Sequence, residues 1–238
     1  MIRIALAIAL AVSTPALAEP HSASARLPAV PAVDPVGLYG DAIEFDVTRK
    51  GDRVGFHRVK FTQEGASTLV SSTFQLQIDL WIFTAFKYLY TSEARWVDGR
   101  LRSLSATVDD GGALSSVDVR PDGDRLMIAN GAATYSALPP LYPTNHWNAS
   151  VLQQKKVLNT LTGRLNSVDI QPRGREAVTT ERGVISATRY AYTGDLDTEV
   201  WYDDDGRWVK MRFVGRDGSA IKYVCRKCQG GLTKNAQR

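Results

Sequence analysis

Hydrophobic and polar residues alternate with a period of two along most of the chain from Leu38 onward. In one such run, Ile43, Phe45 and Val47 are separated by acidic residues. In another, at residues 209–213, apolar side chains alternate with basic ones. Successive side chains of a β-strand point to opposite faces of a sheet, so this pattern predicts strands with one buried face.

Turn signals separate the alternating runs, mostly at intervals of about 8 to 20 residues. Asp-Gly between two such runs is a strong hairpin signal, because both residues tolerate the positive φ angles of tight turns. The signals predict about eleven or twelve antiparallel strands. They lie at Asp98-Gly99, Asp110-Gly111-Gly112, Asp122-Gly123, Thr162-Gly163, Arg182-Gly183, Gly194-Asp195, Asp205-Gly206 and Asp217-Gly218.

One segment interrupts this rhythm. The proline-rich residues 139–143 end a strand, and Thr144 is placed to cap a helix that extends to about Lys156. Trp147 and Val151 would lie on the apolar side of this helix. We therefore expect one short helix near residues 144–156 in an otherwise all-β chain.

The fold class predicted is all-β, with one large, curved antiparallel sheet. A sheet of this size curls, closes or splits into two layers. We expect a barrel or half-barrel with the helix across its mouth, and a two-layer sandwich is the alternative. The strands between residues 74 and 90 hold more aromatic bulk than a thin core needs: Phe74, Trp81, Phe83, Phe86, Tyr88 and Tyr90.

The N-terminus has the pattern of a secretory signal peptide. Arg3 precedes the apolar run Ile4–Val12, and Ala16-Leu17-Ala18 has the form of a cleavage site. The run is less than half of the ~20 residues that span a bilayer, so no transmembrane anchor is expected. We therefore expect cleavage between Ala18 and Glu19 and a periplasmic or secreted protein.

The remaining chain is expected to form one folded domain with short flexible ends. Hydrophobic residues make up 44% and charged residues 23%, which are values of a globular protein and exclude a largely disordered one. Residues 19–36 are rich in Pro and Ala and are predicted to be a flexible lead-in. Residues 37–228 are predicted to form a single antiparallel domain, and residues 229–238 a basic flexible tail.

Cys225 and Cys228 form a C-x-x-C motif near the C-terminus. Haem attachment requires a following His, and this chain has Gln229 there. A zinc site would need further ligands, and a thioredoxin-like redox pair would need a helix start to activate a thiol. A local disulfide suits an oxidising compartment and is the preferred interpretation.

The formal net charge of +4 conceals an uneven distribution. Residues 207–238 hold nine Lys or Arg and one Asp, a net of +8, so residues 1–206 carry −4. Four basic side chains share one face of the last two strands, and an anionic envelope surface is their expected partner. Nucleic acid is not an expected partner of an exported protein. The four residues are Lys210, Arg212, Lys222 and Arg226.

The known catalytic motifs are absent. The chain has no G-x-S-x-G, no H-E-x-x-H and no G-x-x-x-x-G-K-[ST], so no cofactor and no metal is expected. The folded part holds two histidines, His57 and His146. An envelope hydrolase or metal-dependent enzyme that pairs them with Glu93 or Asp203 remains an alternative.

The preferred function is a non-enzymatic binding or carrier protein for an apolar or lipidic ligand held in the curved sheet. The segment around His146 offers the flat indole ring of Trp147 and polar hydrogen-bond donors. The aromatic strands offer an apolar wall. The candidate ligand-binding residues are His57, Tyr88, Tyr90, Glu93, Trp96, Asn145, His146, Trp147, Trp201 and Tyr202.

The order of several short motifs over residues 38–224 resembles the exported bacterial proteins grouped as domain of unknown function 6134. This resemblance implies export and an antiparallel β fold, and it implies no activity and no catalytic residues. The motifs are Val54-Gly55-Phe56-His57, Tyr88-x-Tyr90-x-x-Glu93-x-x-Trp96, Thr144-Asn145-His146-Trp147-Asn148, Gly194-Asp195-Leu196 with Trp201-Tyr202-Asp203, and Gly218-Ser219-Ala220-Ile221-x-Tyr223.

Overall fold

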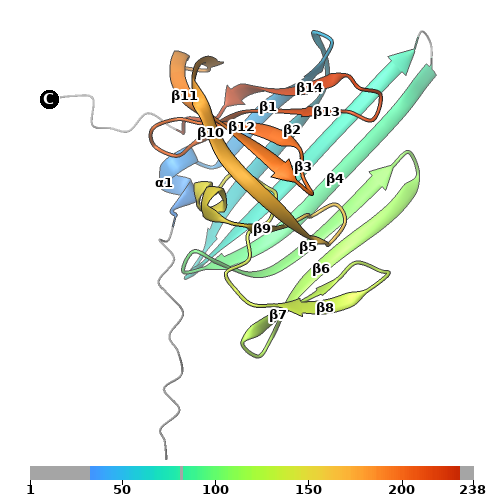
Figure 1. Cartoon of the computed structure of the whole chain (residues 1–238), viewed down its shortest axis with the longest axis vertical. Coiled ribbons are helices and arrows are strands. Elements are labelled where there is room, and N and C mark those ends of the chain that lie inside the picture. Colours follow the sequence, from blue (N-terminus) through green and yellow to red (C-terminus); the bar gives the residue numbers. More distant parts are fainter. Residues whose placement is uncertain (1–32, 81–82, 231–238) are drawn as a thin grey trace, which may run out of the picture.

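The structure, a computed structural model, describes residues 33–80 and 83–230 (Figure 1). The predicted signal peptide with its cleavage site at Ala18 and Glu19 lies outside this part. So do most of the predicted lead-in, Trp81 and nearly all of the predicted basic tail. Within the described residues, no helix combines the length and the apolar character needed to cross a bilayer.

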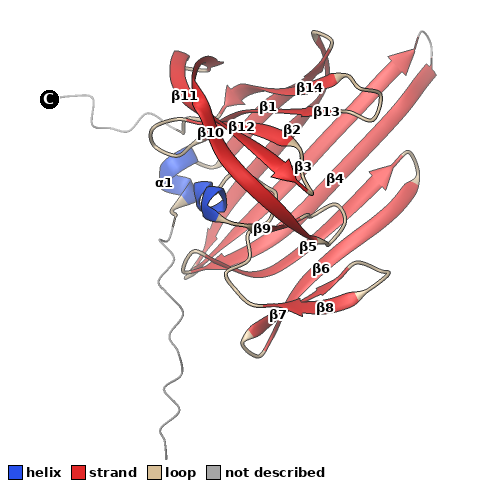
Figure 2. Cartoon of the chain, viewed as in Figure 1, coloured by secondary structure: helices blue, strands red, loops and turns tan. Residues whose placement is uncertain are grey.

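The described chain is built almost entirely of strands, and the fourteen found there form one antiparallel sheet (Figure 2). This confirms the predicted all-β class and curved antiparallel sheet, with more strands than the eleven or twelve expected. The strands are β1 (Ala42–Arg49), β2 (Asp52–Glu64), β3 (Ser67–Leu80), β4 (Phe83–Val97), β5 (Arg100–Asp110), β6 (Ala113–Asp122), β7 (Arg125–Ala129), β8 (Thr134–Ala137), β9 (Lys156–Leu158), β10 (Leu165–Thr180), β11 (Gly183–Gly194), β12 (Thr198–Tyr202), β13 (Trp208–Val214) and β14 (Ala220–Lys227).

The order of the strands in the sheet explains how the chain encloses space. The sheet runs β8-β7-β6-β5-β4-β3-β2-β1-β14-β13-β12-β11-β10-β9. The chain thus begins in the middle of the sheet, proceeds to one edge at β8, and re-enters at the opposite edge with β9. It ends where β14 pairs with β1. The sheet is not closed, and residues 138–155, here called the connector, link its two edges.

The sheet curls so that β10 to β12 lie across β1 to β4 (Figure 1). Strand β10 also contacts β13 and β14, which are not its neighbours in the sheet. The inner face is apolar at alternate positions, as the period of two predicts. Ile43, Phe45 and Val47 on β1 are fully or almost fully buried, whereas Glu44, Asp46 and Thr48 between them are partly exposed.

The helix predicted over residues 144–156 is replaced by a 3-10 helix, η1 (Ala149–Gln153). Its N-cap is Asn148, whose side chain accepts a hydrogen bond from the Ser150 N–H at 3.0 Å. A longer helix does not form because His146 has a φ of 58°, in the left-handed region. Thr144, the expected cap, instead lies against Thr160.

The α-helix of the described chain is α1 (Pro35–Tyr39), which begins inside the segment expected to be a flexible lead-in. The side chain of Asp34 accepts a hydrogen bond from the Val36 N–H at 3.0 Å, and Pro35 occupies the first helical turn. Both features favour a helix start. Helical structure is therefore present before the alternating pattern begins.

The α1 end of the molecule is filled by aromatic side chains. The ring of Trp147, from the connector, lies 5.1 Å from that of Trp96 and 5.5 Å from that of Phe61, between centroids. Phe61 in turn stacks on Tyr39 of α1. This packing closes one end of the curled sheet, and the space that remains lies toward the other end.

Candidate functional site

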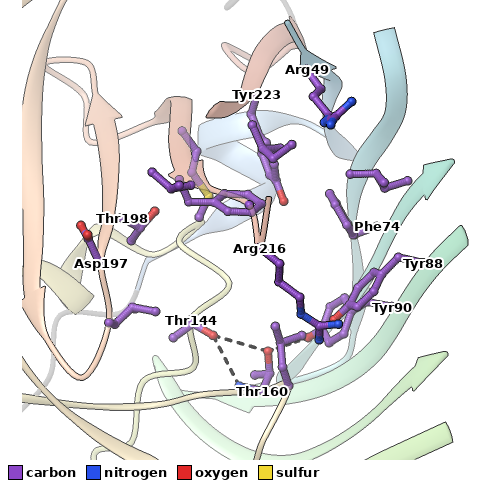
Figure 3. Close-up of a pocket in the computed structure, with 18 of the residues that line it drawn as sticks. Arg49, Phe74, Tyr88, Tyr90, Thr144, Thr160, Asp197, Thr198, Arg216 and Tyr223 are labelled. Carbon is purple, nitrogen blue, oxygen red and sulfur yellow. Dashed lines mark hydrogen bonds between the residues drawn. The ribbon is translucent and has the colours of Figure 1, made fainter. Parts of the chain in front are cut away.

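A cavity of about 660 Å³ lies between the facing walls of the curled sheet (Figure 3). Its size is within the range of roughly 300–1,000 Å³ that is typical of small-molecule sites. Strands β3 and β4 form one wall, and β12, β13 and β14 form the facing one. Most of the lining side chains are apolar or aromatic, among them Phe74, Leu76, Phe86, Met211, Phe213 and Tyr223.

These walls follow from the register of the strands. Phe45 pairs with His57, His57 with Phe74, and Phe74 with Tyr90, so the four side chains form one row across β1 to β4. Directly opposed residues point to the same face of a sheet. The row therefore places aromatic groups side by side on the concave face, and Phe74 stacks on Tyr223 of the facing wall at 5.8 Å.

Charged side chains surround the open end of the cavity, and we call them the rim. The turns that follow β1, β3, β5, β11 and β13 lie at this end, because neighbouring strands are antiparallel. Arg49 pairs there with Asp217, and Arg216 pairs with Asp110 at 2.7 Å. The Arg216 side chain is 86% exposed, so the rim is in contact with solvent.

The ion pair between Arg216 and Asp110 joins two walls. Arg216 belongs to the turn between β13 and β14, whereas Asp110 ends β5. Figure 3 shows the Arg216 side chain extending toward Tyr88, which pairs with Asp110 in the sheet. Such an exposed pair contributes about 1 kcal/mol or less to stability. It therefore connects the two walls at the rim but adds little to the stability of the fold.

The inner end of the cavity is polar but carries no charge. It is formed by three consecutive connector residues, Thr144, Asn145 and His146, together with Thr160. The Thr160 hydroxyl accepts a hydrogen bond from the Tyr90 hydroxyl at 3.0 Å and lies 3.5 Å from that of Thr144 (Figure 3). The Asn145 Nδ2 and His146 Nδ1 atoms are buried without a hydrogen-bond partner.

Tyrosine hydroxyls from β12 and α1 hold the connector in place. Tyr202 donates a hydrogen bond to the His146 carbonyl at 2.6 Å. Tyr39 donates to the Trp147 carbonyl at 2.8 Å and accepts from the Trp208 N–H at 2.9 Å. These bonds fix the backbone at His146 and Trp147, directly after Asn145.

Both histidines of the folded part are buried and neutral. Burial lowers the pKa of His146 to about 4. Burial also lowers the pKa of His57 to about 3, with a smaller contribution from the nearby His146. No carboxylate offsets the cost of burying a charge at either ring, so both imidazoles are uncharged at neutral pH.

The structure brings together four of the ten residues predicted to bind a ligand. Tyr88, Tyr90, Asn145 and His146 line the cavity. Tyr202 supports the inner end through its bond to His146. The prediction therefore located one strand of the wall and the connector.

The other predicted residues lie elsewhere. His57 is shielded by aromatic rings, among them those of Phe74 and Tyr223. Trp96 and Trp147 pack together at the α1 end, where they line a second hollow with residues 33–36. Trp147 is therefore part of the closed end of the molecule, and not of a lid.

Glu93 and Trp201 point away from the cavity. Each follows or precedes a residue whose side chain points inward, and successive side chains of a strand point to opposite faces. Glu93 is exposed, whereas Ser92 beside it is buried. The Trp201 indole donates to Glu176 at 3.0 Å and lies under the Lys210 ammonium, so it belongs to the opposite face from Tyr202.

The acid–base pairs required by the alternative enzyme are not assembled. Glu93 lies on the outer face, as described above. Asp203 accepts a hydrogen bond from the Arg207 N–H at 2.8 Å and forms an ion pair with the guanidinium of the same residue. It therefore shapes the turn after β12, and no carboxylate of the described chain contributes to the lowered pKa of either histidine.

Sequence reasoning missed the rim and part of the inner end. Arg49 and Asp110 end β1 and β5, and Arg216 and Asp217 lie in the turn between β13 and β14, so these residues are far apart in sequence. The signal that could have found them is strand direction, since alternate turns of an antiparallel meander lie at the same end of the sheet. Strand direction does not predict the position of Thr160, because that position depends on the path of the connector between the two edges of the sheet.

Cys225 and Cys228 are joined by a disulfide at the end of β14. Glu181 lies against it and accepts hydrogen bonds from the Cys228 and Gln229 N–H groups at 2.9 and 2.8 Å. Glu181 and the two sulfur atoms are close enough to share a metal ion only if the disulfide is reduced. Both cysteines are buried, which suits a structural bond.

The basic face predicted to contact an anionic surface is partly neutralised. Lys210 lies 3.7 Å from Glu176, and Arg212 lies 3.0 Å from Glu199. Arg226 lies 3.6 Å from Asp46, and Lys222 is exposed. The same three carboxylates also pair with Arg53 and Arg189, so they offset the positive charge of this face only in part.

The comparisons with known proteins agree with this architecture. A family described as "Domain of unknown function (DUF6134)" matches residues 45–226. No curated protein matches the chain. A crystal structure described as a beta-barrel-like protein of domain of unknown function DUF1849 from Brucella abortus is similar, with a TM-score of 0.54 and 10% identity. The match covers 80% of this chain and 97% of that chain, and it shows a common fold alone.

Proposed function

The chain belongs to the DUF6134 family, and we propose that it is a non-enzymatic binding or carrier protein for an apolar or lipidic ligand. The observation that carries this proposal is the cavity of about 660 Å³ in the concave face of the sheet. A preformed hollow with apolar walls and a few polar groups is the usual form of a small-molecule site.

The composition of the walls supports an apolar ligand. Leu76, Met211 and Phe213 offer aliphatic and aromatic surface from opposite walls, and a ligand would cover that surface. Burying apolar surface is worth about 25 cal/mol per Å². Removal of this lining from water therefore supplies the driving force for binding a lipid or another apolar molecule.

The position of the rim supports reversible loading. The charged residues that surround the open end are in contact with solvent, and their ion pairs are of the weak, exposed kind. A ligand can therefore enter and leave without disruption of the core around Trp96 and Trp147. This property distinguishes a carrier from a protein with a permanently enclosed ligand.

We further propose that the protein acts outside the cytoplasm, in the periplasm or the medium. This rests on the signal-peptide pattern of residues 1–18. The same setting would keep the disulfide between Cys225 and Cys228 oxidised.

One experiment tests both proposals. Protein purified without detergent from the cell envelope is weighed intact, and its solvent extract is analysed by mass spectrometry. We expect a mature chain that begins at Glu19 and an apolar compound in amounts comparable to the protein. A chain that retains Met1 would contradict export, and an extract with no compound enriched over a mock purification would contradict the carrier function.

A further inference from the structure

The inner end of the cavity holds two polar groups that lack partners. Asn145 is 5% exposed and His146 is 3% exposed, and both line the cavity. The Asn145 Nδ2 and His146 Nδ1 atoms make no hydrogen bond within the described chain. Buried polar groups in proteins are almost always hydrogen-bonded, so each exception needs an explanation.

The backbone that carries these groups is held in a costly conformation. His146 has a φ of 58°, which is uncommon for a residue other than glycine. The hydroxyl of Tyr202 binds its carbonyl, and Trp147 donates its N–H to the Asn145 carbonyl at 2.8 Å. Strain that the surrounding structure maintains is characteristic of ligand sites.

The surroundings of these two groups are uncharged. The charged residues that line the cavity all lie at the open end, in turns or, for Arg49, at the end of β1; the others are Asp197, Arg216 and Asp217. The two arginines are already paired with Asp217 and Asp110. The histidines beside the inner end are neutral because of burial, so an anion placed there would find no countercharge.

We propose that the ligand is an apolar molecule bearing an uncharged oxygen, and that this oxygen lies at the inner end, bonded to Asn145 and His146. The Nδ2 atom of Asn145 is almost inaccessible in the free protein, so the amide turns toward the cavity and donates a hydrogen bond to the oxygen. The neutral imidazole of His146 either donates to a carbonyl or accepts from a hydroxyl, depending on its tautomer. This inference rests on the proposed function and specifies the chemical class of the ligand and its orientation.

The proposal explains why the inner end is not apolar. A purely hydrocarbon ligand would leave the Asn145 amide unpaired, as it is in the free protein, and would gain no hydrogen bond from it. An ionised headgroup would be excluded by the cost of burying its charge. An alcohol, ester or ketone satisfies both conditions, and its chain then extends along the aromatic walls toward the rim.

The test compares three probes with the same alkyl chain: decane, decanol and decanoate. Each displaces the fluorophore N-phenylnaphthylamine from the mature protein at about pH 8. In the wild type, decanol should displace the fluorophore at concentrations roughly fivefold to tenfold lower than decane, which corresponds to one or two satisfied hydrogen bonds. Decanoate, which is ionised at this pH, should be the weakest of the three.

The variant Asn145→Leu removes the amide at nearly constant volume. It should bind decane as tightly as the wild type or more tightly, and lose most of the preference for decanol. The matched control is Ser72→Ala, which removes a different buried polar group that has no partner in the described chain and does not line the cavity. It should keep the wild-type preference. His146→Phe, which keeps an aromatic ring edge-to-face with Tyr192, provides a second variant if the first fails to fold.

The outcomes separate this inference from the proposed function. Equal binding of decane and decanol to the wild type, or an unchanged preference in Asn145→Leu, would overturn the inference and leave the carrier function standing. Preferential binding of decanoate would also overturn it and would place the headgroup at the arginines of the rim. If neither the fluorophore nor any probe binds, the proposed function itself fails.

Discussion

At the scale of single residues, the two buried histidines are the most informative groups. His57 lies among Phe74, Trp208 and Tyr223, with ring centroids 5.3 to 6.0 Å away, and neither of its nitrogens has a hydrogen-bond partner. It is thus a polar ring in an aromatic environment. Its burial could be predicted, because His57 lies on the same face of β2 as the buried residues two and four positions further along. The absence of a hydrogen-bond partner in the described chain could not be predicted.

These histidines make stability sensitive to acid. Their folded-state pKa values, about 3 for His57 and about 4 for His146, lie below the value near 6.5 of an unfolded chain. As the pH falls below about 6.5, the unfolded chain binds protons first. Between about pH 7.5 and about pH 5, each histidine should therefore remove on the order of 2 kcal/mol from the free energy of unfolding.

The variant His57→Phe should remove about half of this acid sensitivity. Phenylalanine fits the aromatic surroundings and does not titrate, so the variant should be more stable than the wild type at about pH 5. Urea unfolding at several pH values measures the effect. Identical pH profiles of the two proteins would show that His57 is not buried as a neutral ring.

At the scale of elements, the connector is where sequence reasoning was least accurate. The prolines at residues 139–143 correctly predicted that the strand pattern stops. The short helix expected near residues 144–156 is present, but it starts after Asn148 and not at Thr144. The left-handed His146 and the contact between Thr144 and Thr160, which set this start, depend on residues distant in sequence. Strands β8 and β9 have four and three residues, which are too few to show a period of two, so alternation alone predicts fewer than the fourteen strands found in the described chain.

Tyr39 should be the strongest single support of the connector. Its hydroxyl donates to the Trp147 carbonyl and accepts from the Trp208 N–H, and all three groups are buried. Tyr39→Phe leaves both backbone groups unpaired and should lower the free energy of unfolding by about 3 kcal/mol. Tyr202→Phe breaks one bond and should cost roughly half as much.

Chemical denaturation of the two variants beside the wild type measures this difference. If Tyr39→Phe is as stable as the wild type, or if Tyr202→Phe is the more damaging change, the connector is not anchored through Tyr39. A loss of cooperativity in the Tyr39→Phe transition alone would indicate that the connector opens before the sheet unfolds.

At the scale of the whole molecule, the predictable and unpredictable features have different physical origins. Alternation and turn residues are local, and they predicted the all-β class and the curved antiparallel sheet. The pairing of β1 with β14 and the position of the sheet edges are set by contacts between distant residues. The cavity depends on that arrangement, so Tyr88 and His146 could be proposed individually but their convergence could not be derived.

The central claim is that the curled sheet binds one apolar molecule inside its cavity. Titration with N-phenylnaphthylamine tests it most directly, on the wild type and on Ile78→Trp, which narrows the cavity from β3. The control is Thr91→Trp, which adds the same side chain at an exposed position of β4. We predict saturable binding to the wild type and to Thr91→Trp, and roughly tenfold weaker binding to Ile78→Trp. Equal binding to all three proteins would contradict the claim.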